Sequence, residues 1–98
     1  MSTRFIDELR ISPRVEDKLA ARGISPDDVL EVLWGQPAFF RDKVRGRDLM
    51  IGPTDGSRRL ITMVIEPQGD EGIWDVVTGW VSGKGEETRW KSAASRRG

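Results

Sequence analysis

Two short helices are predicted in the first third of the chain, where apolar residues recur at helical spacing behind two Ser-Pro pairs. Ser12 is suited to cap the first helix, and Pro13 takes the first helical position, where proline is tolerated. Val15 and Leu19 then form one apolar stripe. Gly23 is placed to end this helix, because glycine adopts a positive φ without strain.

The second helix has the stronger start signal. Ser25 can cap it, Pro26 again takes the first position, and the carboxylates of Asp27 and Asp28 lie at the positive end of the helix dipole. Apolar residues at positions 29, 30, 32 and 33 supply a buried face. Gly35, followed by a proline two residues later, predicts the end of the helix.

After residue 37 the pattern changes to apolar segments of strand length. The expected strands are residues 38–40 (AFF), 49–51 (LMI), 60–65 (LITMVI) and 73–81 (IWDVVTGWV). Residues 54–56 (TDG) are a strong hairpin signal, and residues 67–72 form a longer loop. The nearly continuous run 60–65 is typical of a central strand. Gly79 marks a bulge or a close approach in the last strand.

The ends of the chain give two further expectations. Residues 1–11 fit either a helix or a strand, because Phe5 and Leu9 have helical spacing while the apolar anchors also suit an extended segment. A last helix is predicted over residues 84–94, and residues 95–98 are expected to be a frayed tail.

The order of these elements predicts an α+β fold in a single domain, residues 1–98. Two short N-terminal helices pack on an antiparallel sheet of about four strands, and a helix closes the chain. The two helices are expected to cover one face of the sheet. The other face is then partly open, and a functional site is expected there.

Composition narrows the chemistry. The chain has no cysteine and no histidine, which excludes disulfides, thiolate metal sites and the usual neutral-pH acid or base. Sixteen basic residues balance sixteen acidic ones, and only residues 36–66 carry an excess of positive charge, with six basic and four acidic residues. A strongly basic nucleic-acid binder is not indicated. No apolar run is long enough to span a bilayer, so a cytoplasmic protein without membrane association is expected.

The chain resembles the BrnT-like toxins of bacterial type II toxin–antitoxin systems, which share the RelE-type fold. The resemblance covers roughly residues 13–90 and rests on the order of five segments: VEDKLAARGIS, PDDVLEVLWGQP, RDLMIGPTDGSRRLI, IWDVVTGW and EETRW. Its matching positions are Ile51-Gly52, Thr54, Gly56, Arg59-Leu60, Thr78-Gly79, Glu86 or Glu87, and Trp90. The resemblance implies a RelE-like sheet and an endoribonuclease that cleaves RNA without a metal or other cofactor. It also implies a cognate antitoxin that neutralises the toxin.

Two positions depart from the pattern of this family. The arginine that the family places just after the small residue of its last strand is Trp80 here. The histidine often found before the glycine of the helix–helix hinge is Arg22. Because the strand arginine lies where a phosphate would bind, its loss bears directly on catalysis.

RNA cleavage needs a base for the ribose 2′-hydroxyl, positive groups around the phosphorus and an acid for the leaving 5′-oxygen. Without histidine, the base is expected to be a carboxylate, with Glu87 the first choice and Glu86 the second. Arg59 and Lys84 complete the predicted catalytic set, with Lys84 as the acid or an added charge. Arg47 and Arg58 are further candidate phosphate contacts, because the guanidinium fork fits phosphate. Trp80 is a candidate RNA contact.

Each of these residues also has a purely structural interpretation. Arg58-Arg59 can be a solvated hairpin flank, residues 41–47 a charged turn, and Glu86-Glu87 the favoured carboxylates of a helix start. At least two of the four tryptophans are expected in the core, and Trp80 is the one expected to be exposed. Two other functions therefore remain open: an inactive RelE-like fold that acts as a protein-interaction module, and a nucleic-acid-binding regulator without cleavage activity.

Overall fold

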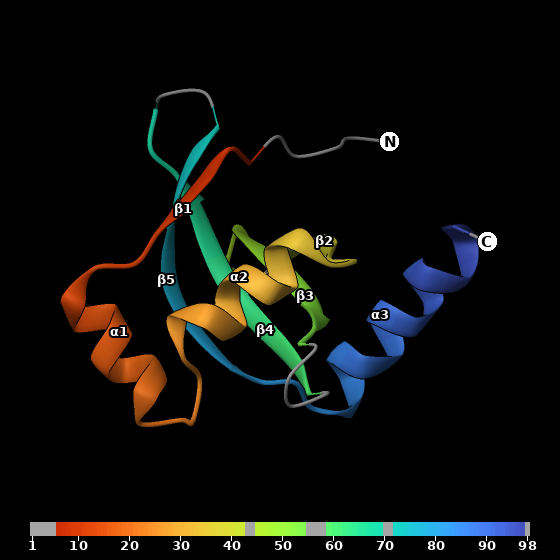
Figure 1. The fold of residues 1–98 in the computed structure, drawn as a ribbon. Helices are drawn as coiled ribbons and strands as arrows, with labels where there is room; N and C mark the ends of the chain where they lie inside the picture. Colours follow the sequence, from red (N-terminus) through yellow and green to blue (C-terminus); the bar gives the residue numbers. More distant parts are fainter. Residues whose placement is uncertain (1–5, 43–44, 55–58, 70–71, 98) are drawn as a thin grey trace.

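The structure, a computed structural model of the chain, describes residues 6–42, 45–54, 59–69 and 72–97. In chain order its elements are β1 (Glu8–Arg10), α1 (Pro13–Ala20), α2 (Pro26–Trp34), β2 (Ala38–Asp42), β3 (Arg47–Pro53), β4 (Leu60–Pro67), β5 (Ile73–Val81) and α3 (Lys84–Arg97). The predicted α+β class and the order of the elements are confirmed (Figure 1). α3 continues to Arg97, three residues beyond its expected end.

The sheet has five strands in the order β1-β5-β4-β3-β2, against the four or so expected. The additional strand comes from the N-terminal segment, where the strand interpretation is the correct one. β1 pairs in parallel with the first three residues of β5, and the Asp7 and Glu8 amides donate to the Gly72 carbonyl. All other pairs are antiparallel. β3 and β4 form the predicted hairpin; its tip, residues 55–58, lies outside the described residues.

Both Ser-Pro signals produce the helix starts that they predict. The Ser12 hydroxyl accepts a hydrogen bond from the Val15 amide at the start of α1. At α2 the Ser25 hydroxyl accepts from the Asp28 amide, and the Asp28 carboxylate accepts from the Ser25 amide, which makes a reciprocal capping box. Gly23 has φ 75°, so the chain leaves α1 through the left-handed conformation that glycine tolerates.

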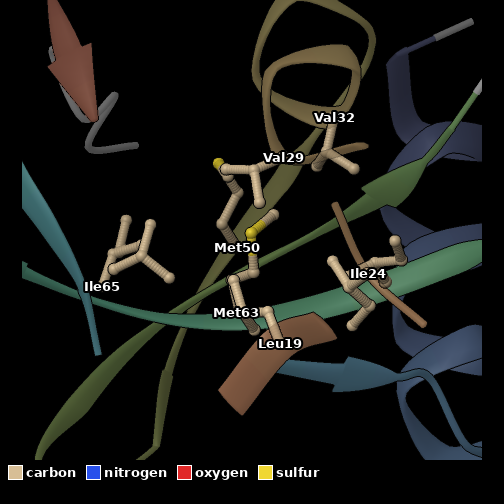
Figure 2. Packing of buried hydrophobic residues seen from close by; sticks show 9 residues of the cluster. Leu19, Ile24, Val29, Val32, Met50, Met63 and Ile65 are labelled. Atoms are coloured by element: carbon tan, nitrogen blue, oxygen red, sulfur yellow. The ribbon is translucent and has the colours of Figure 1, made fainter. Parts of the chain in front are cut away.

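α1 and α2 cover one face of the sheet, and the core lies between these two helices and the sheet (Figure 1). Figure 2 shows the helix side chains meeting the methionines at the centre of β3 and β4. The core cluster consists of Leu19, Ile24, Val29, Val32, Met50, Ile61, Met63, Ile65 and Val76. Gly79 lets α1 approach β5 closely, since a Cβ atom there would lie 3.1 Å from side-chain carbons of both Leu19 and Met63. This confirms the predicted close approach.

A β-bulge in the β4–β5 pairing changes which side chains of β5 face the helices. Ile65 pairs with Val76, but the preceding residue, Val64, pairs with Thr78. Strict alternation along β5 predicts one face for both Trp74 and Trp80, and this is wrong. Trp74 packs against the helix-covered core, whereas Trp80 lies on the opposite, outer face.

α3 contacts β2 and β3, at the end of the sheet away from β1 (Figure 1). The Trp90 indole donates to the Gln36 carbonyl at 3.0 Å, and the Arg89 guanidinium lies 5.8 Å from the centre of the Phe40 ring. None of the helices in the described part of the chain has both the length and the apolar character that a membrane span requires.

Candidate functional site

The candidate site lies on the outer face of the sheet, where β5 passes into α3. Trp80 pairs across the sheet with Thr62, whose hydroxyl is 2.8 Å from the Ser82 hydroxyl. The Ser82 amide donates to the Leu60 carbonyl and fixes the start of the turn into α3. This junction therefore brings together Trp80, Lys84, Glu86 and Glu87 from the predicted set.

Glu86 is engaged in holding this junction. Its Oε1 atom accepts from the Gly83 amide at 2.7 Å and from the Trp80 indole at 3.3 Å. Gly83 immediately precedes α3, and Glu86 is the third residue of the helix, so the first bond corresponds to one half of a capping box. Glu86 thus links the strand end to the helix start, and Trp80 is half-buried rather than exposed, which corrects the expectation for this tryptophan.

Glu87, the first choice for the base, lies one residue further and points to the next turn of α3. Lys91 Nζ donates to its Oε1 at 2.8 Å, one helical turn away. That hydrogen bond and the Lys91 charge, helped by Lys84, hold the pKa of Glu87 below its usual range. A lower pKa keeps the carboxylate ionised but makes it a weaker proton acceptor. Lys84 is exposed and makes no hydrogen bond or ion pair with any described residue.

Arg59 directly precedes β4, at the end of the sheet where β5 passes into α3. Its guanidinium, however, extends to the side covered by α1 and α2. Its Nη2 atom donates to the Gly23 carbonyl at 2.7 Å and lies 3.2 Å from Asp28 Oδ2. Asp28 is the residue that completes the capping box of α2. Arg59 therefore braces the α1–α2 hinge and is not part of the cluster at the β5–α3 junction.

The other two predicted phosphate contacts do not join this cluster. Trp80 is in register with Thr62 of β4 and, beyond it, Ile51 of β3. Arg47 lies four residues from Ile51, about 13 Å away along the strand, and forms an ion pair with Asp42 at 3.4 Å. Its buried Nε atom has no hydrogen-bond partner within the described ranges. Arg58 lies outside the described residues.

The structure instead brings Arg22, which was not among the predicted site residues, to this part of the sheet. Since β1 pairs only with Ile73–Asp75, no strand among the described residues lies beside the second half of β5 on that side. Arg22 occupies this edge, and its Nη1 atom donates to the Gly79 carbonyl at 2.7 Å and to the Thr78 hydroxyl at 3.0 Å. Its other guanidinium nitrogens have no described partner, so most of the donor fork remains available.

Thr78 and Trp80 are neighbours on the outer face, about 7 Å apart at two residues' separation. Arg22 thus delivers a guanidinium beside the position where the resemblance expects a strand arginine. The two departures from the pattern are visible in the sequence, but only the structure places Arg22 at Thr78 and Gly79, the two residues before Trp80. No protein-family model matches this chain, and no curated protein matches it significantly.

Proposed function

We propose that the chain is the toxin of a type II toxin–antitoxin system, an endoribonuclease that cleaves RNA without a metal and is neutralised by a cognate antitoxin. The observation that carries this proposal is the Arg22 guanidinium at Thr78 and Gly79, next to Trp80. It supplies a charged donor fork at the strand position where the sequence alone has lost one. The resemblance to BrnT-like toxins supplies the reaction class.

The proposed reaction needs no group beyond those of the chain and the RNA. The 2′-oxygen attacks the adjacent phosphorus as it loses its proton, the bond to the 5′-oxygen breaks, and that oxygen takes up a proton. Arg22 binds the phosphate and stabilises the charge that develops on its oxygens. Trp80 presents an aromatic surface beside it for a base.

Lys84 is the proposed proton donor, because it is exposed at the junction and lies close enough to Glu87 to affect its pKa. Glu87 accepts the proton of the 2′-hydroxyl and is kept ionised by Lys91. Its lowered pKa predicts slow proton transfer, and therefore a slow enzyme relative to one with a base that titrates near pH 7.

Induction of the protein in a bacterium tests the proposal, with growth and RNA integrity as readouts. Wild type is expected to arrest growth and to fragment RNA. Purified protein should cleave RNA in the presence of EDTA. The assay is run once with free RNA and once with RNA bound to ribosomes. Normal growth together with intact RNA in both settings would reject the function.

A non-catalytic protein-interaction module on the same fold is the second candidate. It is favoured by the fact that Glu86, Glu87 and Arg59 already have partners within the chain. This function predicts no growth arrest, no RNA cleavage and a protein partner whose binding is lost on Trp80→Ala. Cleavage by the purified protein would exclude it as the sole role.

A further inference from the structure

A hollow of about 650 Å³ lies between α1 and β5, at the end of β5 that pairs with β1. β1 pairs only with Ile73–Asp75, and the chain then turns away through Ser12 into α1. No strand among the described residues therefore lies beside Val76 and Val77, and both of these residues line the hollow. Its volume is within the range of pockets that hold small molecules. We call this space the α1–β5 hollow.

Part of the lining is apolar. Ile11, Val15 and Val77 are half-buried there, and Val76 is 2% exposed. Ile11 and Val15 also pack against the core, so the fold fixes their positions. An apolar surface held in place in this way suits the face of a flat ring.

Two cations of α1 line the hollow without a partner of their own. Arg14 and Lys18 are four residues apart, so they lie on the same side of the helix. Both are exposed, and neither makes a hydrogen bond or ion pair with any described residue. The third basic residue of the lining, Arg10, is already bound to Asp75 at 3.3 Å. Arg14 and Lys18 together match the charge of a phosphate monoester, which is about −2 at neutral pH.

The end of β4 contributes groups of another kind to the lining. These are Glu66 and Gln68, and neither side chain is bonded to a described residue. β5 separates them from α1, because β5 lies between β4 and β1 in the sheet and α1 follows β1. Accordingly, no ion pair joins Glu66 to Arg14 or Lys18. A carboxylate and an amide at this distance from the cations are suited to the edge of a nucleobase, where they accept hydrogen bonds from amino groups.

From these features we infer that the α1–β5 hollow binds a nucleoside monophosphate whose base carries an amino group. The phosphate binds Arg14 and Lys18, and the face of the base lies on the apolar part of the lining. The amino group of the base donates to the Glu66 carboxylate. Because a phosphodiester within an RNA chain carries a single charge, two free cations favour a terminal phosphate.

The α1–β5 hollow is separate from the proposed cleavage site. Its lining along β5 ends at Val77, and Arg22 binds the next two residues, Thr78 and Gly79. Neither Arg22 nor Trp80 lines the hollow. The inference therefore goes beyond RNA cleavage, and it holds whether or not the chain cleaves RNA.

Titration with guanosine monophosphate (GMP) tests the site, with NMR signals of the backbone amides and tryptophan indoles as the readout. The amides within residues 11–18, 66–68 and 75–77 are expected to shift, and the Trp80 indole is expected to stay in place. Inosine monophosphate (IMP) is the matched probe, because it differs from GMP only in lacking the amino group. It is expected to bind about three- to tenfold more weakly, the loss typical of one hydrogen bond.

Two variants, each with a matched control, measure which groups hold the nucleotide. Lys18→Gln is expected to weaken GMP binding about three- to tenfold, whereas Arg45→Gln removes a charge outside the lining and should leave it unchanged. Glu66→Ala should make GMP and IMP bind equally, whereas Glu16→Ala should keep the preference for GMP. All four side chains are exposed, so unchanged urea midpoints are expected to confirm that each variant folds.

The inference is overturned by any of five results. These are no shift with GMP, shifts centred on Trp80, unaltered GMP affinity in Lys18→Gln, equal binding of GMP and IMP by the wild type, and inorganic phosphate that binds as tightly as GMP. Guanylyl-guanosine has a phosphodiester but no terminal phosphate. If it bound as tightly as GMP, the inference would also fail, because the hollow would then hold a nucleotide within an RNA chain.

Discussion

The core under α1 and α2 and the β5–α3 junction are organised by different forces. On the helix-covered face, Leu19, Val29, Val32 and Met63 are at most 1% exposed and hold their places by close packing. At the β5–α3 junction on the outer face, Trp80, Glu86 and Glu87 are held by hydrogen bonds and an ion pair at partly exposed positions. The core under α1 and α2 determines much of the fold. The outer face is closely packed as well, since Ile51 and Thr62, in register with Trp80, are fully buried. Only the junction residues can change the chemistry at small cost in stability.

Leu19→Ala should give the largest effect, because it removes a fully buried side chain between α1 and β5. We expect a loss of about 2–5 kcal/mol in the free energy of unfolding, from lost burial and from the cavity that remains. Leu30→Ala, at a position 43% exposed, is the matched control and should change stability by at most about 0.5 kcal/mol. Urea denaturation of both variants measures the contrast, and equal losses would contradict the assignment of the core.

Gly79→Ala tests how closely α1 packs against β5. The added methyl group would lie 3.1 Å from Leu19 and Met63 carbons and 3.2 Å from the Thr62 carbonyl. We expect a loss of about 1–3 kcal/mol from this overpacking. At Gly85 in α3 an added methyl meets nothing within 4 Å, so Gly85→Ala should be neutral or slightly stabilising. A stable Gly79→Ala protein would show that α1 can move away from β5.

Arg59→Ala tests whether this arginine stabilises the fold or takes part in RNA cleavage. Loss of its bonds to Gly23 and Asp28 should lower stability by about 1–2 kcal/mol, because the side chain is only 31% exposed. Arg10→Ala breaks an exposed pair with Asp75 and should cost less than about 1 kcal/mol. Thermal unfolding and RNA cleavage should be measured together at a temperature where both variants are folded. A cleavage defect in folded Arg59→Ala would return this arginine to the site.

Glu87→Gln should have the smallest effect on stability and one that depends on pH. The Lys91 hydrogen bond lowers the pKa of Glu87 in the folded protein relative to the unfolded chain. Its contribution is therefore present above the unfolded value, about 4.3, and is lost as pH falls through the lower folded value. The urea midpoints of wild type and Glu87→Gln should differ slightly at pH 6 and converge toward pH 3. If the difference between the two midpoints stayed constant over that range, the Glu87–Lys91 pair would not be the cause of the stability difference.

Much of the fold could be predicted from local signals. The two Ser-Pro pairs, the glycine at position 23 and the run LITMVI each specify an element through nearest-neighbour chemistry, and each lies where it was predicted. β1 could not be predicted in this way, because three residues pair in parallel with a strand more than sixty positions later. Such a pairing depends on the assembled sheet and leaves almost no periodic signal.

The candidate site was predicted only in part. Glu86, Glu87, Lys84 and Trp80 are close in sequence, so their proximity at the junction follows from a short turn. Arg22 and Arg59 each bind a residue far away in the sequence, Gly79 and Gly23 respectively. Such contacts depend on the tertiary structure, so no local sequence pattern could predict them. The bulge near Val77 also shifts the alternation of β5, so a face assignment made from one end of the strand fails at the other.

The rate of RNA cleavage by purified Arg22→Ala, measured under single turnover in EDTA, tests the central claim most directly. Loss of one phosphate contact in the transition state is worth about 3 kcal/mol, so a decrease of roughly a hundredfold is expected. Arg14→Ala, which removes an exposed arginine from α1, is the matched control and should stay within about twofold of wild type. A folded Arg22→Ala protein that cleaves RNA as fast as wild type would contradict the proposed site.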